Sequence, residues 1–345
     1  MNPEPFRLEP EFFPRIWGVR SLAPFYPQKR DLAQPVGEAW LTARQCRITT
    51  GEFSGRDLQA AWCELPPEAR GAGPSAAQDL PLLVKLIFPA DKLSIQVHPD
   101  DGYASSHEGP GAQGKTEMWH VLAAEHGATL LLGLKPGTTD HAFRAALEAQ
   151  NLEELFEKRS VQEGDTFFVP AGAPHTIGAG MVLCEIQQYS DLTYRVYDYG
   201  RLDASGAPRE LHVEKALEVM RYGPSRAGKV KPLARAAGFS LLAASRYFAA
   251  ERWEFPHPGE IPLSAGHFDL LVIGAGSGHF EWPDGEGAYK SGEAWFVPAG
   301  DAAFRVLPDE HTAVIRAYVP DLARLRAELR HEGFSESKIA QVVFD

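Results

Sequence analysis

The sequence has few cysteines and no long apolar run, and both absences narrow the class of protein. Its three cysteines among 345 residues are widely spaced and form no CxxC pair, so neither a disulfide framework nor a cysteine-based zinc site is expected. No stretch approaches the roughly 18 apolar residues of a membrane-spanning helix. The first residues also lack the basic and then apolar pattern of a signal peptide. We therefore expect a cytoplasmic protein that does not bind a membrane.

Basic residues are scarce relative to acidic ones. The chain has 34 Lys and Arg against 46 Asp and Glu, which gives a formal net charge of −12. Affinity for nucleic acid or for anionic membrane surfaces rests on basic patches, so we expect neither as a partner. If the ligand is an anion, its site must be locally positive against the field of the whole chain.

Long helical patterns are also rare. With 32 Gly and 27 Pro, most segments read as short strands, for example PLLVKLIFP, KLSIQVHP and DTFFVPA. Apolar residues recur at helical spacing in residues 138–158, in residues 209–222 and in a C-terminal tail over 320–345. The sequence thus predicts a mainly β fold of sandwich or barrel type, with two helical insertions and two short helices in the tail.

A repeated phrase indicates how the strands are organised. Residues 160–177 (SVQEGDTFFVPAGAPHTI) and 288–305 (AYKSGEAWFVPAGDAAFR) lie 128 positions apart and share an FVPAG core inside a common frame of Gly and Pro. Such self-similarity predicts a duplicated barrel. We therefore divide the chain into a first barrel over 1–222, a second over 223–319 and the tail. The first copy carries His175 where the second has an alanine, so chemistry is expected in the first barrel.

Four polar side chains of the first barrel are candidate metal ligands. Gln96 and His98 alternate along the run LSIQVH and share one face, where burying unpaired polar groups would cost about 1–3 kcal/mol each. A divalent cation would satisfy them, and two imidazoles with one carboxylate form a recurrent catalytic zinc set. His98 and His175 would supply nitrogen ligands and Glu117 a negatively charged ligand. The side-chain oxygen of Gln96 would be the fourth ligand. His120 follows Glu117 by three, so alternation places it on the opposite face.

These segments resemble a known family. The phrase GxxxxxPxGxxH around His175 looks like the second motif of the cupin superfamily, although Ala179 replaces its usual closing Asn. The segments PLLVKLIFPADKLSIQVHPDD, GKTEMWH, VPAGAPHTI and TYRVYDYGRLDASGAPRELHVEKAL closely resemble the type I mannose-6-phosphate isomerases in their short bacterial form. The resemblance covers residues 15–222 well and the second barrel loosely. Leu41 and Ala43 depart from it, because relatives usually have an acidic residue and Ser there.

The resemblance implies a zinc-dependent interconversion of mannose 6-phosphate and fructose 6-phosphate on two tandem cupin-type jelly-roll barrels, with one Zn²⁺ per chain. By motif position, the residues that match the family's zinc ligands are Gln96, His98, Glu117 and His175. Arg195 matches the essential arginine and Lys115 the active-site lysine. We count Lys115, Arg195 and Glu185 as candidate substrate-binding residues, and a hexose phosphate as the expected small-molecule partner.

Several points stay open at this level. The base that moves the proton could be metal-bound hydroxide, Lys115 with a lowered pKa, or a histidine. Arg201 and Arg209 are equally compatible with phosphate binding and with a plain surface position. Because two histidines and one carboxylate also describe non-haem iron sites, a cupin Fe(II) oxygenase is an alternative function. A sugar-phosphate-binding cupin without turnover is another. The chain is expected to be a monomer or a homodimer.

Overall fold

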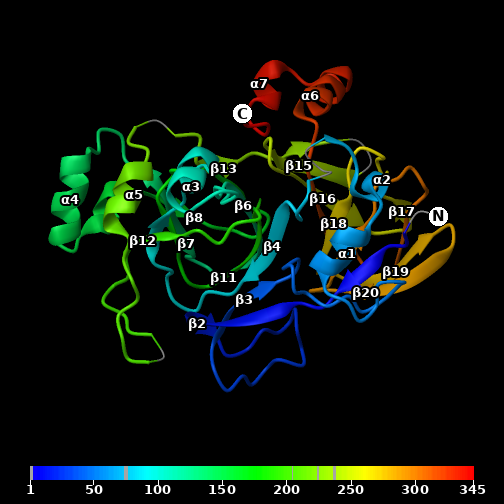
Figure 1. Ribbon diagram of the computed structural model, residues 1–345, viewed down its shortest axis with the longest axis horizontal. Helices are drawn as coiled ribbons and strands as arrows, with labels where there is room; N and C mark the ends of the chain where they lie inside the picture. Colours follow the sequence, from blue (N-terminus) through cyan, green and yellow to red (C-terminus); the bar gives the residue numbers. More distant parts are fainter. Residues whose placement is uncertain (1–2, 74–76, 204, 224, 236–237) are drawn as a thin grey trace.

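The computed structural model describes residues 3–73, 77–203, 205–223, 225–235 and 238–345 (Figure 1). Its strands form four sheets, which group into two pairs of one large and one small sheet. We call the pair that contains Glu117 the first half and the pair that contains Asp269 the second half. Helices are short and few, so the prediction of a mainly β chain is confirmed.

The first half has a seven-stranded and a five-stranded sheet. In spatial order, the large sheet contains β13 (Gly228–Val230), β9 (Thr166–Val169), β6 (Glu117–Ala124), β11 (Met181–Gln188), β4 (Leu82–Ile87), β3 (Val36–Trp40) and β2 (Glu11–Val19). The small sheet contains β12 (Tyr194–Tyr197), β5 (Ile95–Val97), β10 (His175–Ile177), β7 (Thr129–Leu134) and β8 (Phe156–Ser160). Apolar side chains of both sheets, such as Trp119, Leu132 and Phe167, form a common core.

The second half has a seven-stranded and a four-stranded sheet. The large sheet contains β1 (Phe6–Leu8), β21 (Ala294–Val297), β18 (Asp269–Ala275), β23 (Thr312–Tyr318), β16 (Ala249–Phe255), β15 (Phe239–Ala244) and β14 (Leu233–Ala234). The small sheet contains β17 (Gly259–Glu260), β22 (Arg305–Pro308), β19 (Ser277–Trp282) and β20 (Gly285–Lys290). Its core includes Leu271, Phe280 and Trp295.

The largest core of the molecule lies where the two halves meet. Strand alternation sends Cys184 and Ile186 of β11 to this shared core, together with Ile315 of the second half, while Leu183 belongs to the inner core of the first half. The strand β11 is therefore buried on both faces, and Cys184 is a buried residue of that strand.

Two strands cross between the halves. The N-terminal strand β1 pairs with β21 of the second half, through Phe6 opposite Phe296, although the sequence-based division assigns it to the first barrel. Conversely, β13 follows residue 222 and pairs with β9 of the first half, through Lys229 opposite Phe167. The two FVPAG strands are β9 and β21. Because β13 pairs with β9 and β1 pairs with β21, neither FVPAG strand has an unpaired edge.

The described helices are α1 (Leu58–Glu64), α2 (Pro67–Arg70), α3 (Asp101–His107), α4 (Asp140–Glu148), the 3-10 helix η2 (Leu152–Leu155), α5 (Val213–Val219), α6 (Leu322–His331) and α7 (Glu336–Ile339). In Figure 1, α4 and α5 lie at one end of the molecule, and α6 and α7 project at the top of the view. The helix predicted over 138–158 is wrong at its end, because Phe156 is buried and begins β8, which pairs with β7. The insertion over 209–222 contains α5, and the two tail helices are confirmed. None of the described helices is long and apolar enough to cross a membrane.

The repeated phrase occupies equivalent strands in the two halves. Val169 at the end of β9 faces Glu117 of β6, and Val297 at the end of β21 faces Asp269 of β18. Asp269 therefore takes the place in the second half that Glu117 has in the first. The duplication inferred from the sequence is visible in the strand register itself.

At the next pair of interior positions the charges are reversed. In the first half Glu185 lies opposite Lys85 across the ladder, and in the second half Arg316 lies opposite Glu251. Arg316 donates to both oxygens of Asp269, at 2.8 and 2.9 Å, and to Glu251 at 3.3 Å. A guanidinium thus neutralises the interior carboxylates of the second half.

Candidate metal centre and active-site cavity

Three strands of the first half bring the predicted ligands together. His175 begins β10, which lies beside β5, and its register partner there is Gln96. His98 follows β5, and its carbonyl oxygen accepts a hydrogen bond from the N–H of Gly172 at 2.8 Å. Gly172 has a φ of 82°, a conformation that favours glycine, so the Gly-Pro turn holds the strand of His175 against the segment of His98. Glu117 begins β6 in the facing sheet.

The side chains of these residues form one buried cluster. His175 Nε2 lies 3.4 Å and His98 Nε2 lies 3.7 Å from Glu117 Oε1. One potential ligand atom from each of the three lies within 4.8 Å of the others, and no other such group occurs in the described part of the chain. Gln96 extends the cluster, because its side-chain amide lies 3.2 Å from His175 Nε2.

Hydrogen bonds fix the tautomer of both histidines. Nδ1 of His98 donates to the carbonyl oxygen of Leu192 at 2.7 Å, and Nδ1 of His175 donates to that of Ala173 at 3.0 Å. Burial lowers the pKa of His175 to about 4 and lowers the pKa of His98 well below its ordinary value. Both rings are therefore neutral at pH 7, and each directs an Nε2 lone pair toward Glu117, as metal-ligating histidines do.

The donor set fits a divalent cation. Glu117 is fully buried; its Oε2 forms an ion pair with Lys115 Nζ, while Oε1, which lies near both histidines, accepts no hydrogen bond from the described residues. A buried carboxylate oxygen without such a partner is costly unless a cation compensates it. Two neutral imidazole nitrogens and one carboxylate, with an amide beside them, match a catalytic zinc set in which one position stays open.

Lys115 lies beside the cluster and carries a positive charge. Its Nζ is 2.5 Å from Glu117 Oε2, 3.3 Å from His98 Nε2 and 3.7 Å from Glu185 Oε1. Burial alone would lower the pKa of Lys115, but the charges of Glu117 and Glu185 raise it above its ordinary value. This direction is opposite to the lowered pKa that a lysine base would need.

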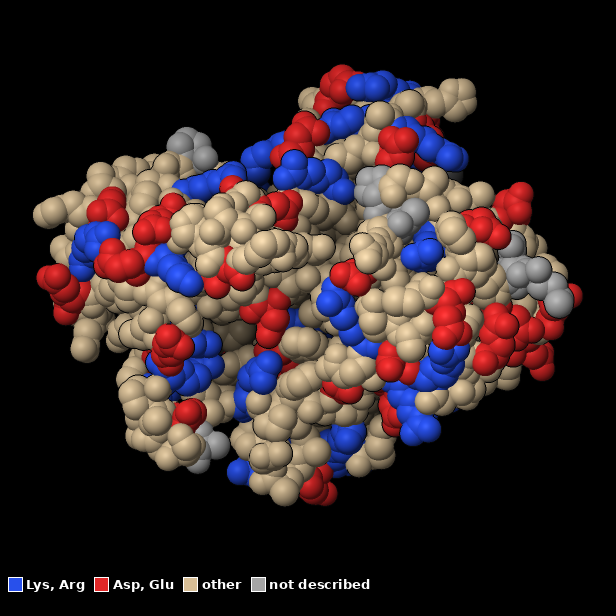
Figure 2. Space-filling view, in the orientation of Figure 1, with Lys and Arg blue, Asp and Glu red and all other residues tan. Residues whose placement is uncertain are grey.

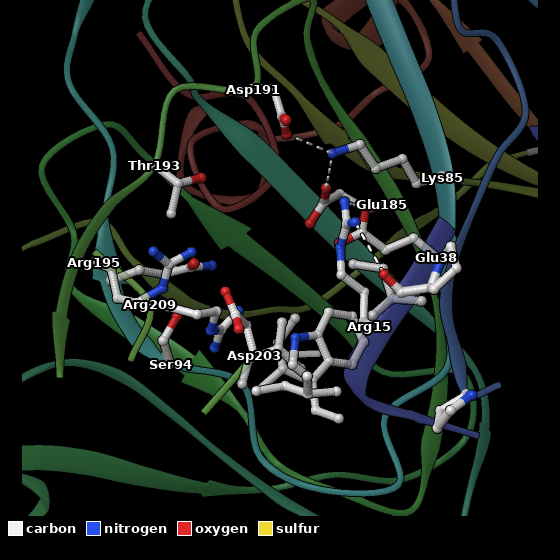
Figure 3. A pocket seen from close by; sticks show the side chains of 18 of the residues that line it. Arg15, Glu38, Lys85, Ser94, Glu185, Asp191, Thr193, Arg195, Asp203 and Arg209 are labelled. Atoms are coloured by element: carbon white, nitrogen blue, oxygen red, sulfur yellow. Dashed lines mark hydrogen bonds and ion pairs between the residues drawn. The ribbon is translucent and has the colours of Figure 1, made fainter. Parts of the chain in front are cut away.

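A cavity of about 600 Å³ adjoins the cluster through Gln96 and Lys115, which belong to its lining. Figure 3 shows other side chains that line it. The space-filling view shows the surface hollowed beside the first half, with acidic and basic side chains at the rim (Figure 2). The polar and charged residues that line the cavity include Arg15, Glu38, Lys85, Ser94, Gln96, Lys115, Glu185, Asp191, Thr193, Arg195, Asp203 and Arg209. Its size is typical of a small-molecule site, for which about 300–1,000 Å³ is usual.

One side of the cavity is a network of buried charges. Glu185 receives a hydrogen bond from the indole N–H of Trp119 at 3.0 Å and lies 3.8 Å from Lys85 Nζ. Burial raises the pKa of Glu185, partly offset by the nearby charge of Lys115. Burial also acts to raise the pKa of Glu38, but the charges of Lys85 and Arg15 bring it below its usual value.

The predicted residues fall into two groups by position. Gln96, Lys115, Glu185 and Arg195 line the cavity, while His98, Glu117 and His175 are buried and contact Lys115 or Gln96. His120 lies outside the cluster, where its Nδ1 hydrogen bonds Thr166 Oγ1 at 3.0 Å.

The sequence reasoning missed several residues of the cavity. Arg15 binds both oxygens of Glu38, at 2.9 and 3.0 Å, and Trp40 donates to the same carboxylate at 2.6 Å. Lys85 was also missed, although a lone lysine within the apolar run LLVKLI was a signal, because a charge in a strand buried on both faces needs partners. No comparable signal marked Arg15.

Comparisons with known proteins agree with this geometry. The description "Phosphomannose isomerase type I, catalytic domain" matches residues 6–121. The mannose-6-phosphate isomerase ManA of Bacillus subtilis is 32% identical over 89% of this chain and 96% of its own length. The mannose-6-phosphate isomerase of Streptococcus mutans is 31% identical over 86% of this chain and 92% of its own.

A solved structure of the Bacillus subtilis mannose 6-phosphate isomerase has the same fold. It superposes with a TM-score of 0.82 at 28% identity and covers 91% of this chain and 99% of its own. A structure of a putative mannosephosphate isomerase from Archaeoglobus fulgidus matches with a TM-score of 0.72 at 19% identity, which supports the fold alone. On its sequence similarity over nearly the whole length, this chain belongs to the type I mannose-6-phosphate isomerase family.

Proposed function

We propose that the chain interconverts D-mannose 6-phosphate and D-fructose 6-phosphate, with a divalent metal ion at the buried cluster. The observation that carries this proposal is that Lys115 and Gln96, which contact the cluster of His98, Glu117 and His175, line the same cavity as Arg195. The similarity to mannose-6-phosphate isomerases over nearly the whole chain supports the same substrate pair.

Zn²⁺ is the proposed ion, held by His98, Glu117 and His175 with the side-chain amide of Gln96 as a further ligand. The two imidazole nitrogens in this set favour zinc over magnesium or calcium, which prefer oxygen ligands. When bound, the ion would supply positive charge that stabilises negative charge on the substrate oxygens. Iron(II) binds the same types of ligand, and elemental analysis of the purified protein distinguishes the two metals.

The reaction moves a carbonyl between C1 and C2 of the opened sugar. A proton leaves one carbon and returns to the other, and negative charge develops on the two oxygens in the enediolate. Lys115 keeps its proton because of Glu117 and Glu185, so its ammonium can donate a hydrogen bond to a developing oxyanion. A preorganised charge of this kind in a buried site favours the transition state over the ground state.

Two further residues would hold the substrate. Arg195 lines the cavity and is the cross-strand neighbour of Gln96, so its guanidinium reaches the sugar next to the metal cluster. Glu185 lies on the other side, where its carboxylate can accept a hydrogen bond from a sugar hydroxyl. Together they orient the carbons that exchange the proton.

The test is a coupled isomerase assay on purified protein with metal quantitation. Removal of the metal by a chelator should abolish formation of fructose 6-phosphate from mannose 6-phosphate, and Zn²⁺ should restore it. Full activity after complete metal removal would contradict the metal role. Stoichiometric iron with oxygen uptake would indicate an oxygenase instead. Binding of hexose phosphate without exchange of the C2 hydrogen would indicate a protein that binds without turnover.

A further inference from the structure

Two arginines lie side by side in the cavity, on the side opposite Lys85 and Glu185 (Figure 3). Arg195 is the cross-strand neighbour of Gln96 and is therefore adjacent to the metal cluster. Arg209 comes from the loop that follows β12, and after burial its charge has the largest effect in lowering the pKa of Arg195. Two positive charges this close together need an anion.

The protein compensates Arg195 only in part. Its Nη1 donates to the carbonyl oxygen of Glu210 at 2.8 Å, but its buried Nε has no hydrogen-bond partner among the described residues. A buried N–H without a partner is costly, and a ligand oxygen would satisfy it. The free donor of Arg195 is thus a second sign, besides the paired charges, that this side of the cavity receives an anion.

Asp198 holds Arg209 in place. Nε of Arg209 donates to Asp198 Oδ2 at 2.7 Å and its Nη2 contacts Oδ1, so Nη1 stays available. The Asp198 side chain is 5% exposed, and its pKa is lowered below the usual value because the hydrogen bonds from Arg209 and Arg201 outweigh burial. A charged, buried carboxylate of this kind orients a guanidinium well.

Arg201 shares Asp198 but does not line the cavity. Its Nη2 lies 2.6 Å from Asp198 Oδ1, while its Nη1 contacts Asp91 at 3.3 Å and the carbonyl oxygen of Lys92. The Arg201 and Arg209 side chains are equally buried, at 17% and 18% exposure. Arg201 therefore provides a matched control for the position of Arg209.

One acidic residue faces the same region. Asp203 lines the cavity, but its Oδ1 accepts the backbone N–H groups of Ser205 and Ala207, at 2.8 and 3.1 Å, and the Ser205 hydroxyl at 2.6 Å. Oδ1 is thus engaged within its own loop, and among the described residues Asp203 forms no ion pair with Arg195 or Arg209.

We infer that Arg209 binds the phosphate group of the substrate and that Asp198 is the residue that positions it. The inference rests on the proposed function, because it assigns the orientation of a bound hexose phosphate in the cavity. The reacting carbons lie at the metal cluster and Lys115, the phosphate lies at Arg209, and Arg195 lies between them. An arginine fork suits phosphate because its N–H groups match two phosphate oxygens.

The main experiment compares Arg209→Gln with Arg201→Gln in steady-state kinetics. In Arg209→Gln, KM for mannose 6-phosphate should rise at least about tenfold and competitive inhibition by inorganic phosphate should weaken equally, while kcat changes less than about threefold. Metal content should be unchanged. In Arg201→Gln, both constants should stay within about twofold of the wild type.

Unchanged KM and phosphate inhibition in Arg209→Gln, or equal changes in both variants, would overturn the inference. Calorimetric titration of inorganic phosphate into wild type and Arg209→Gln separates it from the proposed function, because it needs no turnover. Arg209-dependent phosphate binding in a protein without isomerase activity would support the inference and defeat the proposed function. An active isomerase whose phosphate binding ignores Arg209 would do the reverse.

The positioning role of Asp198 has its own readout. Asp198→Asn should raise KM with little change in kcat, and the double variant Asp198→Asn/Arg209→Gln should resemble Arg209→Gln within about twofold. Independent effects that multiply in the double variant would show that Asp198 does not act through Arg209.

Discussion

Lys115 Nζ lies 2.5 Å from Oε2 of Glu117 at the foot of the cavity. The two residues are separated by one position, so the extended segment that carries them points both side chains the same way. A carboxylate that belongs to the metal cluster therefore also keeps the adjacent ammonium charged. With an ion bound as proposed, the Lys115 ammonium and the ion would both act on the same substrate oxygens.

Loss of one histidine of the cluster should reduce metal binding. His175→Ala removes an Nε2 donor, so purified protein should contain at least about tenfold less zinc at equal free metal, as expected when a ligand is lost. His120→Asn is the control, since His120 is as buried but lies outside the cluster. Elemental analysis after dialysis measures both; retention of a full equivalent by His175→Ala would exclude it as a ligand.

Arg195→Ala should leave the metal bound and slow the reaction. The variant removes the positive charge that is proposed to contact the substrate, so kcat should fall by about two decades or more. The coupled assay gives the rate, and metal quantitation on the same sample shows whether the cluster is intact. A variant that keeps both its metal and its rate would remove Arg195 from the catalytic residues.

The buried His120 should make the folded state less stable in acid. Burial, together with the charge of Arg252, lowers the pKa of His120 to about 3. An unfolded chain takes up this proton below about pH 6.5, whereas the folded chain does so only near pH 3. The stability that the folded state gains from a neutral His120 is therefore fully present above about pH 6.5. It is lost progressively as the pH falls from 6.5 toward 3.

The corresponding measurement compares urea unfolding of wild type and His120→Asn at pH 7, 6 and 5. The difference in unfolding free energy should fall by about 1.4 kcal/mol for each pH unit below 6.5, which is the slope of one proton. Parallel curves for the two proteins across this range would show that His120 is not the group concerned.

The charge-reversed interior of the second half should be sensitive to loss of its guanidinium. Arg316→Met leaves the buried carboxylates of Asp269 and Glu251 without their cation, and removal of one partner of a buried pair costs about 3–5 kcal/mol. Arg305→Gln, which breaks the exposed pair with Glu281, should cost less than about 1 kcal/mol. Denaturant unfolding gives both values, and equal small losses would contradict the prediction.

Local pattern was enough to predict much of this molecule. The alternation of Gln96 and His98, the turn before His175 and the repeated FVPAG phrase are all short-range features, and each pointed to strands or side chains that the structure brings together. Recognition of the family added Lys115 and Arg195, which a single sequence does not otherwise mark as special.

The missed features depend on contacts between distant segments. Arg15 reaches the cavity only because β2 pairs with β3 and carries it to Glu38, and nothing in its own neighbourhood signals this. Phe156 was placed in a helix because its spacing suited one, yet pairing of β8 with β7 prevailed. Tertiary context overrides local preference in both cases.

The crossing of β1 and β13 means that the duplicated halves are no longer separable. A fragment cut after residue 222 would retain Phe6 without Phe296, and the edge of β9 that pairs with β13 would be left unpaired. In the remaining fragment, the edge of β21 that pairs with β1 would be unpaired in the same way. Removal of the first eight residues would therefore destabilise the second half, although that half lies farthest from them along the chain. The two duplicated halves are thus expected to fold as one cooperative unit.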